Sequence, residues 1–290
     1  METKPYVVSA DIYLLLVKWA KQNGFTLPNK EFFVKLRKEF STYMSKIFSN
    51  FELISEEEIL EHSANIVSKN NVPIISLDTI YFSSDYLIEL TRSVSPEGLD
   101  KGLHRRFGSE SLFKQLNVLK KSGIKEVCLY DDVIFSGVLA ERIIRLLSIL
   151  GINISKFYAG IGIQEGIDKI ENSFSIEVNC AHTYDQVVDE VCERDFYLGI
   201  PYSGRSLIDG ENFGLSYILP FGKPEAWASI PNEYQESFSI FCINQTIKLF
   251  EEIENNSNKI VYSSDIERKV PGQPKSGRYV DFLKSIHIKI

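Results

Sequence analysis

The sequence is poor in features that would place it outside the cell or in a membrane. It has four cysteines, Cys128, Cys180, Cys192 and Cys242, and none of them forms a Cys-X-X-Cys pair. This scatter is typical of reduced, mostly buried thiols in a cytosolic chain. No apolar run approaches the ~20 residues that a membrane-spanning helix needs. The first residues lack the basic-then-apolar layout of a secretory signal. We therefore expect a cytoplasmic protein without a membrane partner.

Positive charge is also in short supply. The 32 Lys and Arg residues are outnumbered by 39 Asp and Glu residues, which gives a net charge of −7. A chain of this charge has no overall field that attracts nucleic acid, although a local basic patch is still compatible with it. The apolar fraction of 44% and the charged fraction of 24% are typical of an ordinary globular protein.

The first part of the chain is predicted to be helical. Apolar residues recur at helical spacing in 11–22, and further helices are expected at about 29–48 and 55–68. Ser55 and Glu58 fit the capping box, in which a hydroxyl and a carboxylate satisfy backbone donors at a helix start. A winged-helix nucleic-acid module would need a basic recognition stripe, which is missing, so a helical cap or dimer surface is the preferred interpretation.

From Val72 onward, short apolar strands alternate with helices. Strands are expected at 72–76, 86–90, 126–130, 156–163 and 173–178, helices at 111–121, 138–150 and 233–254, and a loop at 93–110. A short helix or strand is expected at the end. Alternation of this kind predicts an α/β protein whose parallel sheet is covered on both faces. We expect a helical N-terminal subdomain (1–70), an α/β core (71–215) and a C-terminal helical extension packed on that core (216–290).

The segment 127–139 carries the most chemistry. It reads Val-Cys-Leu-Tyr-Asp-Asp-Val-Ile-Phe-Ser-Gly-Val-Leu, which is an apolar strand, two acids, a short loop and a helix start. In open α/β sheets, ligands bind beyond the carboxyl ends of the strands. Loop amides and a helix N-terminus suit a phosphate, Gly137 allows close approach, and Ser136 adds a hydroxyl. Asp131 and Asp132 can accept hydrogen bonds from two sugar hydroxyls, as ribose 5-phosphate would offer.

This segment resembles the phosphoribosyl-pyrophosphate (PRPP) motif of type I phosphoribosyltransferases. Asp131 and Asp132 match the acidic pair. The resemblance implies that the phosphate and ribose are bound by Val133, Ile134, Phe135, Ser136, Gly137, Val138 and Leu139. Phe135 and Leu139 depart from the family pattern, which has small or hydroxyl-bearing residues there. The family also holds pyrophosphate on a small or glycine-containing loop after its first core strand, whereas this chain has Asp78 in that region and no glycine.

Other segments are similar to further parts of these enzymes. The Asp-Phe-Tyr-Leu-Gly stretch from Asp195 resembles the hood of purine phosphoribosyltransferases, which implies that Phe196 or Tyr197 stacks on a base; an aromatic packing loop is the alternative. Basic contacts to pyrophosphate would come from five arginines: Arg92, Arg105, Arg106, Arg194 and Arg205. A solvated basic turn is the alternative for the loop that contains His104, Arg105 and Arg106. The spacing of Cys180, His182 and Cys192 fits none of the usual zinc sites.

The resemblance implies a protein that binds PRPP or a nucleoside monophosphate and makes or breaks an N-glycosidic bond at C1′ with a nucleobase. Mg²⁺ would be held through the ligand, with no protein side chain assigned to it. The alternative is a non-catalytic sensing or interaction subunit. Arg194-Asp-Phe, Pro201-Tyr-Ser-Gly-Arg and Leu219-Pro-Phe-Gly are similar to larger proteins of phage base-modification or bacterial antiviral defence systems. That similarity implies a protein partner from the same operon, and an oligomer is compatible with it.

Overall fold

The computed structural model describes residues 4–68, 70–84, 86–208 and 211–287. Their contacts divide the chain into two compact units built from interleaved segments. The first unit comprises Met1–Leu53, Arg92–Gly102 and Val188–Ile290, and the second comprises Ile54–Thr91 and Leu103–Val187. The three consecutive segments expected from the sequence (1–70, 71–215 and 216–290) are therefore not the units that the structure forms. Each unit is defined by the contacts that its residues make, and these contacts join segments that are far apart along the chain.

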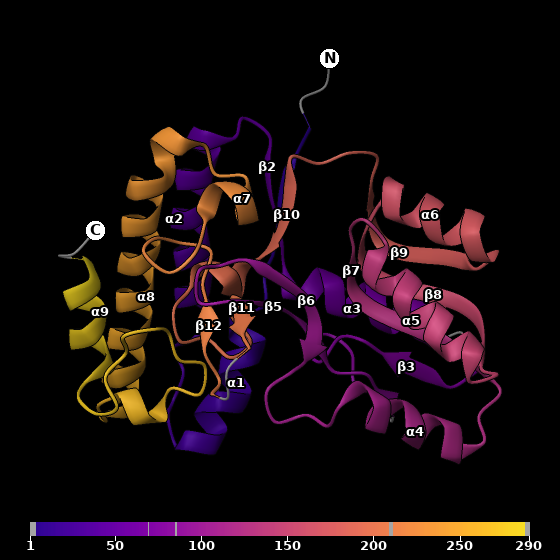
Figure 1. Ribbon diagram of the computed structural model, residues 1–290. Helices are drawn as coiled ribbons and strands as arrows, with labels where there is room; N and C mark the ends of the chain where they lie inside the picture. The colour runs from indigo at the N-terminus through magenta and orange to yellow at the C-terminus, as the bar shows by residue number, and fades with distance from the viewer. Residues whose placement is uncertain (1–3, 69, 85, 209–210, 288–290) are drawn as a thin grey trace. The chain divides into compact units, whose positions relative to one another are not determined.

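The second unit is built on a five-stranded parallel sheet (Figure 1). The strand order is β4-β3-β7-β8-β9, and every neighbouring pair is parallel. The strands are β3 (Ile74–Ser76), β4 (Tyr86–Leu87), β7 (Glu126–Ile134), β8 (Asn153–Ile163) and β9 (Glu177–Tyr184). The expected α/β class with a parallel sheet is confirmed.

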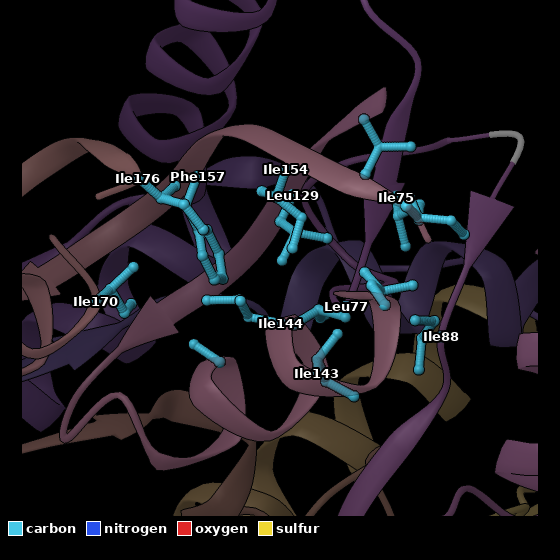
Figure 2. Close-up of a cluster of buried hydrophobic side chains, with 14 of the residues drawn as sticks. Ile75, Leu77, Ile88, Leu129, Ile143, Ile144, Ile154, Phe157, Ile170 and Ile176 are labelled. Carbon is cyan, nitrogen blue, oxygen red and sulfur yellow. The ribbon is translucent and has the colours of Figure 1, made fainter. Parts of the chain in front are cut away.

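Helices cover both faces of this sheet. The helices α4 (Leu112–Ser122), α5 (Val138–Ile149) and α6 (Gln164–Phe174) contribute to one hydrophobic core with the strands. Figure 2 shows this core, in which Ile143 and Ile144 of α5 meet Leu129 and Phe157 of the sheet. On the other face, α3 (Glu56–Val67) packs against β8 and β9. The capping box predicted from Ser55 and Glu58 is present at the start of α3.

Two expectations for the middle of the chain need correction. The structure has a helix up to Phe174 and a strand only from Glu177, whereas a strand was expected at 173–178. Helix α6 was not predicted because its buried face is small, being limited to Gly166, Ile167 and Ile170. The segment 93–110 was expected to be a loop, yet β5 (Leu90–Val94) and β6 (Asp100–Arg105) reach into it. These strands are polar, and pairing between β11, β5 and β6 stabilises them.

The first unit contains two small sheets and several helices. One sheet has the order β10-β1-β2 and the other β12-β11-β5-β6. The strands new to this description are β1 (Tyr6–Ser9), β2 (Phe51–Ile54), β10 (Asp189–Cys192), β11 (Arg205–Leu207) and β12 (Gly214–Leu215). The helices are α1 (Ile12–Asn23), α2 (Lys30–Ile47), α7 (Pro224–Ala228), α8 (Gln235–Ser257) and α9 (Tyr279–His287). Short 3-10 helices are η1 (Glu193–Phe196), η2 (Asn232–Tyr234) and η3 (Ser263–Asp265).

The predicted N-terminal helices and the predicted long C-terminal helix are confirmed as α1, α2, α3 and α8. Strands β1 and β2 were not predicted. Each has only four residues, and the parallel partner of Tyr6 is Asp189, far along the chain. Within the described ranges, no helix combines the length and the apolarity that crossing a membrane requires.

Candidate functional site

The acidic pair lies inside the last part of strand β7. A strand was expected only at 126–130, with the two acids after it. The strand in fact runs to Ile134, so Asp131 and Asp132 lie within it. The pairing with β8 explains the extra length, because Val133 and Ile134 are still in register with Ile161 and Gly162. The pair nevertheless remains at the carboxyl end of a central strand, where open α/β sheets bind ligands.

The two carboxyl groups are strongly coupled. Asp131 is only 6% exposed. Burial raises its pKa well above the usual range, and the neighbouring charge of Asp132 raises it further. A side-chain hydrogen bond joins Asp131 to Asp132, and the Asp131 carboxylate also accepts from the backbone N–H of Asp132 at 3.0 Å. Burial and the adjacent carboxylate therefore both disfavour the charged form of Asp131.

The loop after β7 has a tightly packed backbone. Gly137 has φ of +68° and forms the N-cap of α5 without a side-chain cap. A Cβ at Gly137 would lie 3.0 Å from the carbonyl oxygen of Gly166 in the first turn of α6, and a Cβ at Gly166 would lie 2.4 Å from the carbonyl oxygen of Phe135. The two glycines thus let the loop lie directly against α6. The strand–loop–helix arrangement expected for the segment is present, with Val138 and Leu139 as the first residues of α5.

Helix α5 begins with backbone N–H groups that have no partner within the helix, as every α-helix does. Its first turn contains Glu141, but the Glu141 carboxylate is paired with Arg145 and Lys169 at 2.9 and 2.8 Å. These two cations partly offset its negative charge. The loop and the start of α5 therefore keep the electropositive character that suits an anion.

A third carboxylate lies at the same edge of the sheet. Strand β3 is the neighbour of β7, with Ser76 in register with Tyr130, and Asp78 follows it two residues later. The Asp78 side chain accepts from the backbone N–H groups of Ile80 and Tyr81 at 2.9 and 2.7 Å. Burial raises the pKa of Asp78 to about 6, and the charge of Asp132 acts in the same direction. The sequence indicated Asp78 only as the residue present in place of a glycine-containing pyrophosphate loop. Parallel pairing of β3 with β7 brings it to the edge that carries the acidic pair.

Contacts with helix α3 and with the Asp78 turn fix the part of β7 that precedes the acidic pair. Tyr130 is fully buried, and its hydroxyl lies 2.5 Å from the hydroxyl of Ser63 on α3. The Tyr130 ring also packs on Phe82 with ring centroids 4.7 Å apart, and Phe82 donates its backbone N–H to Asp78 at 3.0 Å. The residue before the acidic pair is therefore fixed by contacts to α3 and to the Asp78 turn.

The side chains of this edge do not form a protein-only metal centre. Among the described residues there is no group of three or more His, Cys, Asp or Glu side chains arranged to hold a metal ion. The carboxylates at the edge still fit a hard cation such as Mg²⁺, which prefers oxygen ligands and keeps several waters. Asp132, which is the less buried member of the pair, is the side chain best placed to contribute an oxygen to an ion that arrives with a phosphorylated ligand.

The predicted base-stacking residues lie in a core. Phe196 and Tyr197 are both 0% exposed and belong to the first unit. The Phe196 ring packs against Phe40 and Phe238 with centroid distances of 5.7 and 5.1 Å. Neither ring presents a face on which a base could stack, so the structure corrects this expectation. The alternative, an aromatic packing segment, describes these two residues.

Arg194 has a structural role in the first unit. Its guanidinium forms an ion pair with the buried carboxylate of Asp11, and its backbone N–H donates to the same group at 2.9 Å. Glu193 beside it is fully buried and pairs with Arg37 at 3.0 Å. Burial raises the pKa of Asp11 to about 7 although Arg194 acts in the opposite direction. A buried guanidinium that already neutralises a carboxylate is poorly suited to bind pyrophosphate.

The other predicted arginines are divided between the units. Arg92 and Arg205 belong to the first unit, where both lower the pKa of Asp189 against the larger effect of burial. The Arg205 guanidinium stacks on the Trp227 ring at 4.6 Å. Arg105 and Arg106 belong to the second unit, where Arg105 ends β6 and Arg106 begins the connection to α4. The Arg105 guanidinium donates to the carbonyl oxygen of Ser109 in that connection.

The fold and the site define an α/β protein in which carboxylates at the carboxyl end of a parallel sheet lie next to a helix whose N-cap is a glycine. No family model matches the sequence, and no curated protein matches it either.

Solved structures similar to the chain include two phosphoribosyltransferases and a UMP synthase. Orotate phosphoribosyltransferase from Aeropyrum pernix has 13% sequence identity and a TM-score of 0.26, over 44% of this chain and 68% of its own. The adenine phosphoribosyltransferase of Giardia lamblia, complexed with 9-deazaadenine, has 11% identity and a TM-score of 0.29, over 45% and 80%. Leishmania donovani UMP synthase has 10% identity and a TM-score of 0.28, over 46% and 28%. Similarities this low do not assign an activity to this chain.

Proposed function

We propose that the second unit binds a 5-phosphoribosyl ligand, either PRPP or a nucleoside monophosphate, and makes or breaks an N-glycosidic bond at C1′. The observation that carries the proposal is the position of Asp131 and Asp132 at the carboxyl end of β7, directly before the loop at Gly137 and the start of α5. Two sugar hydroxyls would donate to the carboxyl groups. The 5-phosphate would accept from backbone N–H groups of the loop and of the first turn of α5.

The acidic pair has a chemical use in such a reaction. Breaking or making a bond at C1′ passes through a sugar with oxocarbenium-like positive charge. A carboxylate fixed before the reaction starts stabilises that charge without reorganisation. The acidic pair supplies this negative charge, and the side-chain hydrogen bond between Asp131 and Asp132 fixes the positions of the two groups. Substituting both by asparagine keeps the shape and removes the charge.

The proposal includes Mg²⁺ as a cofactor that arrives with the ligand. Asp132 would contribute an oxygen, and the remaining positions would be filled by ligand oxygens and water. Bound there, the ion supplies neutralisation of phosphate charge. The side chains of the edge align and orient the sugar, and the loop backbone holds the 5-phosphate.

A non-catalytic sensing subunit is the second candidate, and one observation favours it. Phe196 and Tyr197 are fully buried, so the side chains expected to hold a nucleobase are not offered to one. A protein that binds the ribose phosphate without a base-stacking hood would report ligand concentration to a partner. In a phage base-modification or bacterial defence setting, that partner would be a protein encoded in the same operon, which would co-purify with the chain.

The test is binding and turnover measured together. The whole chain would be titrated by calorimetry with Mg-PRPP and with nucleoside monophosphates, and incubated with a panel of bases while pyrophosphate and free base are quantified. The enzyme proposal expects saturable binding with turnover, and the sensor proposal expects binding alone. Lack of binding by every one of these ligands would refute both.

A matched pair of variants assigns the site. Asp131→Asn combined with Asp132→Asn should abolish turnover and weaken binding at least tenfold. Glu126→Gln, at the exposed start of the same strand, removes a carboxylate charge from β7 and should leave binding unchanged. If the double variant kept its binding and turnover, the assignment of the site would be wrong.

A further inference from the structure

In the turn after β3, three backbone N–H groups bind the carboxylate of Asp78, a residue of the same turn. The backbone N–H groups of Ile80, Tyr81 and Phe82 all point to the Asp78 carboxylate, at 2.9, 2.7 and 3.0 Å. Successive N–H groups arranged around a concavity commonly bind an external anion. Here the anion is Asp78 itself, which is 2% exposed. The turn therefore has these three donors already in use.

The position of this turn relative to β7 is fixed by backbone pairing. The N–H of Leu77 donates to the carbonyl oxygen of Tyr130 at 2.7 Å, so the residues after β3 lie beside the residues that follow Tyr130 on β7. The pairing of Ser76 with Tyr130 places the two strand ends at the same level, and the charge of Asp132 raises the pKa of Asp78. Asp78 and the acidic pair thus share one edge of the sheet in the second unit.

The loop at Gly137, to which we assign the 5-phosphate, lies on the other side of the acidic pair from Asp78. Gly137 contacts Gly166 of α6, and α6 follows β8. In the strand order β3-β7-β8, β3 and β8 flank β7 on its two sides. A ribosyl ligand with its 5-phosphate at the loop and its C2 and C3 hydroxyls at Asp131 and Asp132 then has C1 directed toward β3. The reason is that C1 and C4, which carries the 5-phosphate arm, flank the two hydroxyl-bearing carbons on opposite ends.

We propose that Asp78 is a specificity-determining residue that selects 5-phosphoribosyl ligands without a pyrophosphate at C1. The proposal rests on the proposed function and chooses between its two ligand classes. A pyrophosphate at the C1 end would meet the carboxylate of Asp78. The three N–H groups of the turn could not bind the pyrophosphate, because they already donate to Asp78. Asp78 is too buried to share a bridging Mg²⁺ without leaving the turn. The favoured ligands are ribose 5-phosphate and nucleoside 5′-monophosphates, whose C1 substituent carries no charge of that size.

The test compares two ligands on one protein. Calorimetric titrations of the whole chain in Mg²⁺ would use ribose 5-phosphate and PRPP as probes. We expect the wild-type protein to bind ribose 5-phosphate at least as tightly as PRPP. Tighter binding of PRPP than of ribose 5-phosphate would overturn the inference while leaving the proposed function in place. Failure of both probes, and of AMP and UMP, to bind would instead overturn the proposed function.

Two substitutions sharpen the comparison. Asp78→Asn removes the charge and retains one acceptor oxygen, and it should shift the ratio of the two dissociation constants toward PRPP by about tenfold, which equals about 1.4 kcal/mol. Asp168→Asn removes one charge on α6, where Asp168 accepts from Gln164 at 2.7 Å, and should leave the ratio unchanged. An unchanged ratio in Asp78→Asn would contradict the inference. If that variant did not fold, the wild-type ratio would decide alone.

Discussion

The hydroxyl groups of Tyr130 and Ser63 lie 2.5 Å apart and join strand β7 to helix α3. Both residues are buried, and Tyr130 directly precedes the acidic pair. A buried hydroxyl without a partner is costly, so each of these groups depends on the other. This hydrogen bond therefore fixes the strand that carries Asp131 and Asp132 to helix α3.

Removing either hydroxyl should destabilise the second unit. Tyr130→Phe and Ser63→Ala should each lower the free energy of unfolding by about 1–3 kcal/mol, because each leaves a buried hydroxyl unpaired. The double variant should lose less than the sum of the two. Hydrogen exchange of the β7 amides is the suitable measurement, since Trp19 and Trp227, the two tryptophans of the chain, belong to the first unit. Additive losses would show that the hydroxyls act independently.

The close approach of the loop to α6 can be tested with a matched pair of glycines. Gly137 and Gly151 have similar φ values of +68° and +74°, but a Cβ at Gly137 would meet Gly166 at 3.0 Å whereas a Cβ at Gly151 would meet nothing within 4 Å. Gly151→Ala should cost about 1–2 kcal/mol, as the left-handed backbone alone requires. Gly137→Ala should cost more and should also weaken binding of ribose 5-phosphate. Equal losses of stability would show that the contact with Gly166 is easily relieved.

The stability of the second unit should fall as pH rises through about 6. Burial raises the pKa of Asp78 to about 6, whereas an unfolded aspartate has a pKa of about 3.9. The folded state then holds a proton that the unfolded state has released, so the stabilisation is complete below about pH 4 and is lost as pH rises through about 6. The raised pKa of Asp131 acts in the same direction.

Asp78→Asn should reduce this pH dependence, and Asp168→Asn should preserve it. Protection of the β7 amides from hydrogen exchange, corrected for the intrinsic exchange rate at each pH, would be compared between about pH 4.5 and 7.5 in the three proteins. A wild-type unit that became more stable over this range would contradict the predicted direction.

The buried charges of the first unit should be far more important to stability than its surface pairs. Glu193 is fully buried and its carboxylate accepts from the Arg37 guanidinium at 3.0 Å. Arg37→Leu would leave that charge without its cation and should cost about 3–5 kcal/mol. Lys248→Met removes a partly exposed pair with Glu39 and should cost less than about 1 kcal/mol.

Trp19 makes this comparison measurable. Its indole N–H donates to the carbonyl oxygen of Asp265 at 2.8 Å within the first unit, so its fluorescence reports unfolding of that unit. Urea titrations of the two variants should separate by several kcal/mol. Equal midpoints would show that backbone donors, such as the N–H of Asp11 at 3.2 Å, are sufficient to stabilise Glu193.

Several elements were predictable because their signals are local. The capping box at Ser55 and Glu58 and the apolar spacing of α5 depend on residues within a few positions of one another, and both are present. The strand–loop–helix arrangement around Gly137 was predictable for the same reason. Strand β1 was not, because Tyr6 pairs with Asp189 and four residues carry too little pattern to indicate so distant a partner.

The sequence by itself determined the parallel α/β class and the acidic pair beside a glycine-cornered loop, because periodicity and motif spacing are properties of neighbouring residues. Tertiary structure alone decided the rest. It placed Asp78 beside Asp132 through the pairing of β3 with β7, and it buried Phe196 and Tyr197 in an aromatic core. Residue type does not reveal burial, since an aromatic ring that could stack on a ligand is equally suited to fill a core.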